Sequence, residues 1–358
     1  MRRAFPVIFA SLLSFGALEA LVFHTGVYPY IVSTESSTGL VETVLHNERI
    51  RPRTTPNQVV AIGDSRMALV ARVANKLTSE TGYEFGTIAA AGSTTRCWYY
   101  MLRDADPTRD QYKAILIGIE SYDDIDSEEN HADRESDLNY VLPHLRLSDL
   151  QEFSQSYTIP ERQWRAARGI AIKGLVYQRD FQDLMQNPLK RWRTIRQSWR
   201  DSHVWFYDYI ETGKNLAGLT VDWPNRTLTV PPGTDPGLEA ALKRNLVQPL
   251  PAQTGNRTAY LTYWTNRIYD LYRGSNTKLI FVRLPRAPFI RPDLPVKPQS
   301  ALRLLAQRPN VILVPQETFE VLEKPEYFRD EVHMNQAGLD YFSETVARKM
   351  RELVEPAH

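Results

Sequence analysis

Four consecutive apolar residues at positions 59–62 run directly into a Gly-Asp-Ser tripeptide at 63–65. A short apolar run that ends at a glycine is typical of a buried strand that stops abruptly. The residues from Met67 to Ser79 have a helical pattern, so Ser65 is expected on the turn between a strand and a helix. Backbone N–H groups at a helix N-terminus favour negative charge, and a serine there becomes a nucleophile when a base activates it. The same position also suits a serine that only caps the helix.

The rest of the chain repeats this alternation of strand and helix. Apolar runs predict strands at residues 59–62, 84–91, 114–119, 278–283 and 311–314. Helices are expected at residues 67–79, 96–103, 257–272, 299–307 and 336–353. Strands and helices that alternate at this spacing predict an α/β fold with a five-stranded parallel sheet and helices on both faces.

Residues 121–255 interrupt the pattern, because they contain no strong series of strands. Residues 161–203 within them are basic, with ten Lys or Arg residues against four acidic ones, and contain several tryptophans. This stretch fits contact with anionic lipid or with an acidic glycan. It also fits a solvated pair of helices with the tryptophans packed beneath. We interpret residues 121–255 as a largely helical insertion in the sheet domain.

The N-terminus has the pattern of a membrane segment. Two arginines precede residues 4–23, which are apolar except for two serines and Glu19. Twenty helical residues at ~1.5 Å each span a hydrocarbon core of about 30 Å, and arginines before the span predict a cytoplasmic N-terminus. Residues 1–27 are therefore expected to be a single-pass signal anchor, with the rest of the chain in the periplasm or at the cell surface. A signal peptide cleaved after Ala20 and a buried N-terminal helix are the alternatives.

The expected organisation has five parts. They are an anchor at 1–27, a linker with some helix at 28–56, the sheet domain at 57–120 and 256–358, and the insertion at 121–255. The linker is expected to end in an extended stalk, Arg51–Pro56. A formal charge of +1 gives no bias toward nucleic acid. The single cysteine, Cys97, excludes an intrachain disulfide and a Cys-rich metal site, and we expect no metal and no cofactor.

A second polar segment supplies the groups that a serine nucleophile needs. Asp330 and His333 lie on a loop just before the final helix, and a histidine base needs an acceptor at its other ring nitrogen. Loops that follow parallel strands meet at the carboxyl edge of the sheet, so this loop is expected to lie near Ser65 and Gly92. Gly92 is the candidate oxyanion donor, because no side chain hinders approach to its backbone N–H.

Three blocks resemble the SGNH/GDSL hydrolase family in their order and spacing. They are Gly63-Asp64-Ser65, Ala91-Gly92-Ser93-Thr94-Thr95 and Asp330-Glu331-Val332-His333. The resemblance covers residues 57–120 and 275–350 and skips the insertion. It implies a flavodoxin-like sheet.

The resemblance also implies the role of each site residue. Ser65 would be the nucleophile, His333 the base, Asp330 the residue that orients this base, and Gly92 an oxyanion donor. One block departs from the family, which usually has Gly-x-Asn-Asp after the third strand. This chain has Glu120 in place of the asparagine, and an ionised glutamate cannot donate a hydrogen bond to an oxyanion. A divergent third block behind a membrane segment is similar to the SGNH-like proteins of polysaccharide acetylation.

These features predict a serine acyltransferase or esterase that acts on cell-envelope or exported polysaccharide through an acyl-Ser65 intermediate. Arg66 and Arg283 are expected to face the crevice and to hold an anionic group or a sugar hydroxyl. The acyl donor is expected to arrive from a membrane protein, and the choice between transfer and hydrolysis stays open. One alternative is an inactive scaffold or glycan-binding component, which Glu120 favours. The other is a lipid esterase that uses the membrane only for access.

Overall fold

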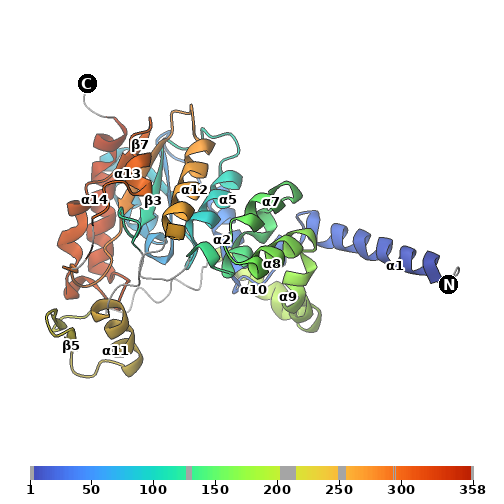
Figure 1. The fold of residues 1–358 in the computed structure, drawn as a ribbon. Helices are drawn as coiled ribbons and strands as arrows, with labels where there is room; N and C mark the ends of the chain where they lie inside the picture. Colours follow the sequence, from blue (N-terminus) through green and yellow to red (C-terminus); the bar gives the residue numbers. More distant parts are fainter. Residues whose placement is uncertain are drawn as a thin grey trace. The chain divides into compact units, whose positions relative to one another are not determined.

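The structure, a computed structural model, describes residues 4–125, 131–201, 215–248, 255–292, 294 and 296–355. Its central feature is a parallel sheet of five strands, with the order β2-β1-β3-β6-β7 (Figure 1). The strands are β1 (Gln58–Ile62), β2 (Glu84–Thr87), β3 (Ala114–Ile119), β6 (Lys278–Arg283) and β7 (Val311–Leu313). The α/β fold and the five parallel strands expected from the sequence are confirmed.

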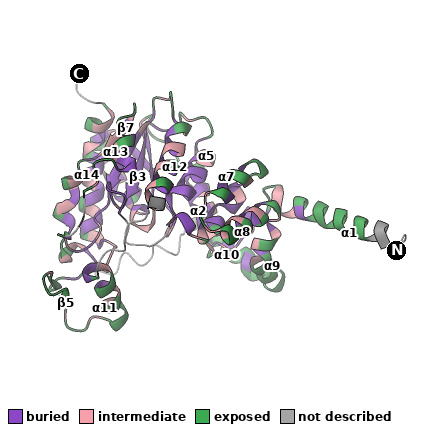
Figure 2. Cartoon of the chain, viewed as in Figure 1, coloured by how far each residue is buried: buried purple, intermediate pink, exposed green. Residues whose placement is uncertain are grey.

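Helices cover both faces of this sheet, and Figure 1 shows it between two groups of them. On one side, α3 (Val70–Ala74) packs against α14 (Gln336–Val354). On the other, α12 (Gly255–Leu271) packs against α5 (Thr95–Ala105) and α13 (Ala301–Leu305). Every residue of β1 and β3 is buried, and β3 is purple in Figure 2. Burial on both faces explains why these strands are continuous apolar runs.

The chain divides into two compact units that differ from the expected boundaries. The described residues 48–125, 131, 215–248 and those from 255 onward form the sheet unit. The described residues 4–47 and 132–201 form a helical unit. The expected insertion is therefore divided between the two units. The expected linker contains the helix α2 (Ser37–Ile50) and contributes residues to both.

The helical unit contains most of the remaining helices. They are α1 (Ala4–Glu19), α6 (Ser136–Val141), α7 (Leu150–Gln155), α8 (Pro160–Ala171), α9 (Gly174–Gln186) and α10 (Pro188–Asp201). The sheet unit adds α4 (Thr78–Thr81), α11 (Pro236–Leu242) and an antiparallel ribbon of β4 (Thr220–Asp222) and β5 (Thr227–Thr229), which the sequence did not predict. Residues 126–130, 202–214 and 249–254 of the expected insertion lie outside the described residues.

The N-terminal segment differs from the expected transmembrane helix over residues 4–23. The helix α1 has 16 residues and continues into a π-helical turn, Ala20–His24. No helix among the described residues is both long and apolar enough to cross a membrane. Glu19 at the end of α1 is buried, and its carboxylate accepts a hydrogen bond from the N–H of Gly174 (3.0 Å) at the start of α9. The two arginines that were expected at the cytoplasmic end lie outside the described residues.

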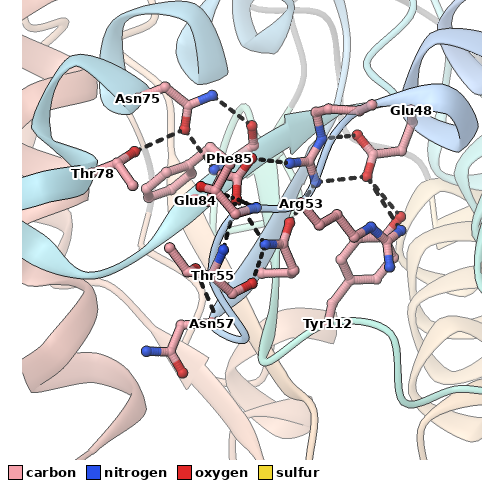
Figure 3. A network of polar contacts seen from close by, with 12 residues as sticks. Glu48, Arg53, Thr55, Asn57, Asn75, Thr78, Glu84, Phe85 and Tyr112 are labelled. Atoms are coloured by element: carbon pink, nitrogen blue, oxygen red, sulfur yellow. Dashed lines mark hydrogen bonds and ion pairs between the residues drawn. The ribbon is translucent and has the colours of Figure 1, made fainter.

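A network of charged side chains holds the amino edge of the sheet (Figure 3). The carboxylate of Glu84, the first residue of β2, accepts hydrogen bonds from Thr54 N–H (2.6 Å), Gln58 Nε2 (3.0 Å) and Arg51 Nη1 (3.1 Å). Arg51 also donates two hydrogen bonds to Glu48 in α2. Burial alone would raise the pKa of Glu84, but the hydrogen bonds from Gln58 and Thr54 lower this pKa to about 2. The segment expected to be an extended stalk is therefore hydrogen-bonded to the sheet.

Candidate active site

Ser65 lies at the carboxyl edge of the sheet, three residues after the end of β1. It begins a 3₁₀ turn, Ser65–Met67, in which the Asp64 carboxylate accepts a hydrogen bond from the N–H of Arg66 (2.9 Å). A Cβ atom at Gly63 would lie 2.6 Å from Cγ of the buried Met67, so the turn needs a residue without a side chain there. The local sequence therefore fixes the direction in which the serine leaves the strand.

Ser65, His333 and Asp330 form a continuous chain of hydrogen bonds. Oγ of Ser65 lies 2.7 Å from Nε2 of His333. Nδ1 of the same ring lies 3.0 Å from each carboxylate oxygen of Asp330. The structure thus brings together the three residues that the sequence predicted as nucleophile, base and orienting acid, with the geometry of a serine–histidine–acid triad.

The surroundings of Asp330 keep its carboxylate ionised. This carboxylate accepts hydrogen bonds from the N–H groups of Val332 (3.0 Å) and His333 (2.7 Å), and the Arg329 guanidinium lies 3.2 Å away. Burial alone would raise the pKa of Asp330, but the contacts with His333 and the N–H of Val332 lower it to about 2. An ionised Asp330 accepts a hydrogen bond from the Nδ1–H group of His333. Nε2 is then left to accept the proton of the Ser65 hydroxyl.

The loop that carries His333 is held at both ends. Backbone bridging joins Phe328 to Met334, and the side chain of Asn335 caps α14 by accepting a hydrogen bond from Gly338 N–H (3.1 Å). The same Asn335 donates to the carbonyl of Glu326 (2.7 Å). A Cβ at Gly338 would lie only 2.6 Å from the carbonyl oxygen of Tyr327, which explains the glycine. This loop is therefore preorganised for its part in the triad.

Gly92 lies in the turn that follows β2. The backbone N–H of Ala90 and the hydroxyl of Ser93 both donate to the carbonyl of Gly63, at 3.1 and 3.2 Å. These bonds place the turn beside the segment that leads to Ser65. Gly92 has a φ of +72°, a left-handed conformation that favours glycine. Its role as an oxyanion donor stays a prediction.

Glu120 and Arg66 lie next to each other at the same edge. Glu120 directly follows β3, and its Oε2 is 3.9 Å from Nη2 of Arg66. Arg66 also pairs with Asp64 at 2.6 Å. The Arg66 cation therefore offsets part of the negative charge that Glu120 brings to this edge of the sheet.

Arg283 is not brought to this site. It is the last residue of β6 and is 1% exposed. Its guanidinium pairs with Glu323 at 2.5 Å and donates to the carbonyl of Gln316 at 3.2 Å. A charge this deeply buried needs such partners, so Arg283 supports the loop that follows β7 rather than facing the crevice.

A small open pocket is lined by Glu331 and Val332, the two residues between Asp330 and His333, and by Glu120. Its polar lining residues are Glu120, Ser121, Asn245, Arg286, Arg291 and Glu331, and its apolar ones are Ile125, Ala287, Phe289, Leu294 and Val332. Burial and the charge of Arg283 lower the pKa of Arg286, whose guanidinium lies 3.8 Å from Glu323. Sequence reasoning missed Arg286 and Phe289. The only signal was the proline-rich loop that follows the strand at 278–283.

Within the described part of the chain, no group of three or more His, Cys, Asp or Glu side chains is placed to hold a metal ion. No family model matches the chain, and no curated protein sequence matches it. The resemblance to the SGNH family therefore rests on the three motifs and on the contacts of Ser65, His333 and Asp330.

Proposed function

We propose that this protein is an SGNH-type serine acyltransferase or esterase that forms an acyl-Ser65 intermediate. The observation that carries the proposal is the hydrogen-bonded chain from Ser65 through His333 to Asp330, at 2.7 and 3.0 Å. The order of the five sheet strands, numbered along the chain, is 2-1-3-4-5, which is the flavodoxin-like order. Ligands of such sheets bind at the carboxyl ends of the strands, which is where Ser65 lies.

The first half of the reaction acylates the serine. Nε2 of His333 takes the hydroxyl proton of Ser65 while Oγ attacks the carbonyl carbon of the donor ester. The resulting oxyanion is stabilised by the N–H groups of Gly92 and Ser65. His333 then gives its proton to the leaving oxygen, and the bond between this oxygen and the carbonyl carbon breaks. Asp330 stabilises the imidazolium that forms in between.

The second half of the reaction removes the acyl group and regenerates the Ser65 hydroxyl. A hydroxyl group of the acceptor takes the place of the leaving group, gives its proton to His333 and attacks the acyl carbon. The bond to Ser65 Oγ breaks, and His333 reprotonates this oxygen. A sugar hydroxyl as acceptor gives transfer and water gives hydrolysis, so the balance depends on how well the site excludes water.

The pocket beside the triad supports a polysaccharide acceptor. Glu120 and Arg286 offer an acceptor and a donor of hydrogen bonds, while Phe289 and Val332 offer apolar surface. Sugars present hydroxyl groups next to apolar ring faces, so this mixture suits them. The acyl donor, in this proposal, is delivered by a membrane protein.

We also propose that residues 4–23 hold the protein at a membrane and that the sheet unit acts outside the cytoplasm. Large apolar side chains along this segment are more than half exposed, at positions 8, 9, 12, 13, 15, 18 and 21. Exposed apolar surface of this extent favours contact with lipid over contact with water.

A second candidate function is an inactive scaffold or glycan-binding component that keeps the fold. Glu120 favours it, because an ionised carboxylate lies where the family has an oxyanion donor. The two functions differ in what Ser65→Ala does. Loss of turnover supports the enzyme, whereas glycan binding that survives this substitution, with no turnover to lose, supports the scaffold.

Turnover of a small activated ester, with and without a polysaccharide acceptor, tests the proposed function. We expect release of the alcohol to depend on Ser65 and His333, and the acyl group to appear on the acceptor. Acid that accumulates at the same rate with and without the acceptor would assign hydrolysis. A preference for long acyl chains would favour a lipid esterase.

A further inference from the structure

The end of α9 and the start of α10 form a hairpin tip, residues 181–196, in the helical unit. Four large apolar side chains of this tip are exposed: Phe181 (38%), Met185 (67%), Leu189 (73%) and Trp192 (53%). Phe181 and Met185 are four residues apart and Leu189 and Trp192 three apart, so each pair shares a helix face. The alternative for residues 161–203, a solvated pair of helices with its tryptophans packed beneath, does not hold for Trp192, because this side chain is exposed.

Exposed cations accompany these apolar side chains. Lys190, Arg193 and Arg196 are all exposed. The pKa of Asp183 is lowered by Arg191 and Asn187 and, to a smaller extent, by the charge of Lys190. The acidic side chains of the hairpin, Asp180 and Asp183, are both paired with the buried Arg191. The hairpin tip therefore presents positive charge next to exposed apolar side chains.

We propose that the hairpin tip lies on an anionic lipid surface. Met185, Leu189 and Trp192 would enter the boundary between headgroups and acyl chains, while Lys190 and Arg193 would contact the headgroups. Basic side chains near an anionic surface strengthen binding to it. Charge complementarity and apolar exposure at the same tip together identify lipid as the partner.

The arrangement of α1 in the same unit supports this assignment. Glu19 at the end of α1 accepts a hydrogen bond from Gly174 in α9, and Phe23 stacks on Tyr177 with ring centroids 5.7 Å apart. The exposed apolar side chains of α1 and the hairpin tip thus belong to elements in direct contact. An acidic glycan fits less well at the tip than in a cleft of the same unit that lies beside Trp164 and is lined by Arg165 and Arg168.

Lipid binding by the hairpin tip is a property separate from the proposed acyl transfer and does not depend on it. A protein without activity at Ser65 would still bind lipid through the hairpin tip. Failure of one proposal is therefore distinguishable from failure of the other.

The test places an environment-sensitive fluorophore on the full-length protein in vesicles. Leu189→Cys carries the label, and Leu147→Cys is the matched control, because Leu147 is 63% exposed in the same unit. The vesicles are phosphatidylcholine alone or a mixture with phosphatidylglycerol. The native Cys97 is buried and remains unlabelled in the folded protein. Both labelled proteins carry the same α1, so any attachment through α1 is common to both, and the comparison isolates the tip.

We expect the label at 189 to shift to the blue and to be quenched severalfold more by lipid-borne nitroxide than the label at 147, in the anionic vesicles only. Exchange of Lys190, Arg193 and Arg196 for glutamate should remove this difference while the circular dichroism stays unchanged. A label at 189 that stays as accessible to water as the label at 147 in both vesicle types would overturn the proposal. Protection of this label by soluble polygalacturonate instead of vesicles would assign the tip to an acidic glycan and overturn it as well.

Discussion

At the scale of single residues, the proposed role of His333 depends on the charge of Asp330. The pKa of Asp330 is about 2, below the usual 3.8, so its carboxylate is charged above about pH 3. Asp330→Asn removes this charge and favours the wrong tautomer of the ring. If Asp330 orients His333 as the acid of a serine triad does, we expect kcat/KM for an activated ester to fall by about 10³–10⁴-fold at pH 7. Asp340→Asn on α14 is the control and should change little. An unchanged rate in Asp330→Asn would contradict the assigned role.

Glu120 is the second residue whose chemistry can be tested. Glu120→Asn would restore the amide donor that the family has at this position, whereas Glu120→Ala only removes the charge. If the oxyanion forms near residue 120, ester hydrolysis by the asparagine variant should exceed that by the alanine variant by about 10²-fold. Steady-state kinetics of the two variants measures this ratio. Equal rates would show that residue 120 does not face the oxyanion.

At the scale of elements, Glu84 joins β2 to the segment that precedes β1. Hydrogen bonds to a charged group contribute about 1.5–3 kcal/mol each, so Glu84→Gln should lower the free energy of unfolding by about 2 kcal/mol at pH 7. The pKa of Glu84 is lowered from 4.5 to about 2 on folding. Its contribution is therefore complete above pH 4.5 and is lost as the pH falls toward 2. Urea unfolding from pH 7 to pH 2.5 measures this change.

The control for this prediction is Glu80→Gln. Glu80 has an exposed side chain and pairs with Arg348 on the surface, where such pairs contribute little. We expect a change within about 0.5 kcal/mol for it at every pH. A loss of stability in Glu84→Gln that did not shrink toward pH 2 would show that the charge of Glu84 is not what holds the segment.

The elements also show which parts of the molecule a sequence can predict. The strand before Ser65 and the loop of Asp330 and His333 are each determined by residues that are close in the sequence. Local sequence patterns therefore predict both. The partners of Arg283 are Glu320 and Glu323, which are distant in the chain, and no local pattern indicates that this arginine is buried. Arg286 was missed for the same reason. The predicted helix at 67–79 is divided into α3 and α4 by a 3₁₀ turn at 75–77.

At the scale of the whole molecule, the chain folds as a sheet unit and a helical unit, each assembled from separate parts of the sequence. Composition changes along the chain did not reveal this division, because residues 4–47 and 132–201 associate only in three dimensions. The predicted membrane attachment belongs to the helical unit, whereas the candidate site belongs to the sheet unit.

The proposed location makes a prediction at this scale. A C-terminal reporter that is active only outside the cytoplasm should be active on the full-length protein, and the protein should sediment with membranes. Fractionation and reporter activity in intact bacterial cells measure both. A reporter active only in its cytoplasmic form would contradict the extracytoplasmic location.

The central claim is that Ser65 is an activated nucleophile. Labelling of the full-length protein with a fluorophosphonate tests it most directly, since such a probe reacts with a serine that a neighbouring base has activated. We predict covalent labelling of the wild type on Ser65 and none in Ser65→Ala or His333→Ala, with all three proteins folded by circular dichroism. No labelling of the folded wild type, or labelling that persists in Ser65→Ala, would contradict the claim.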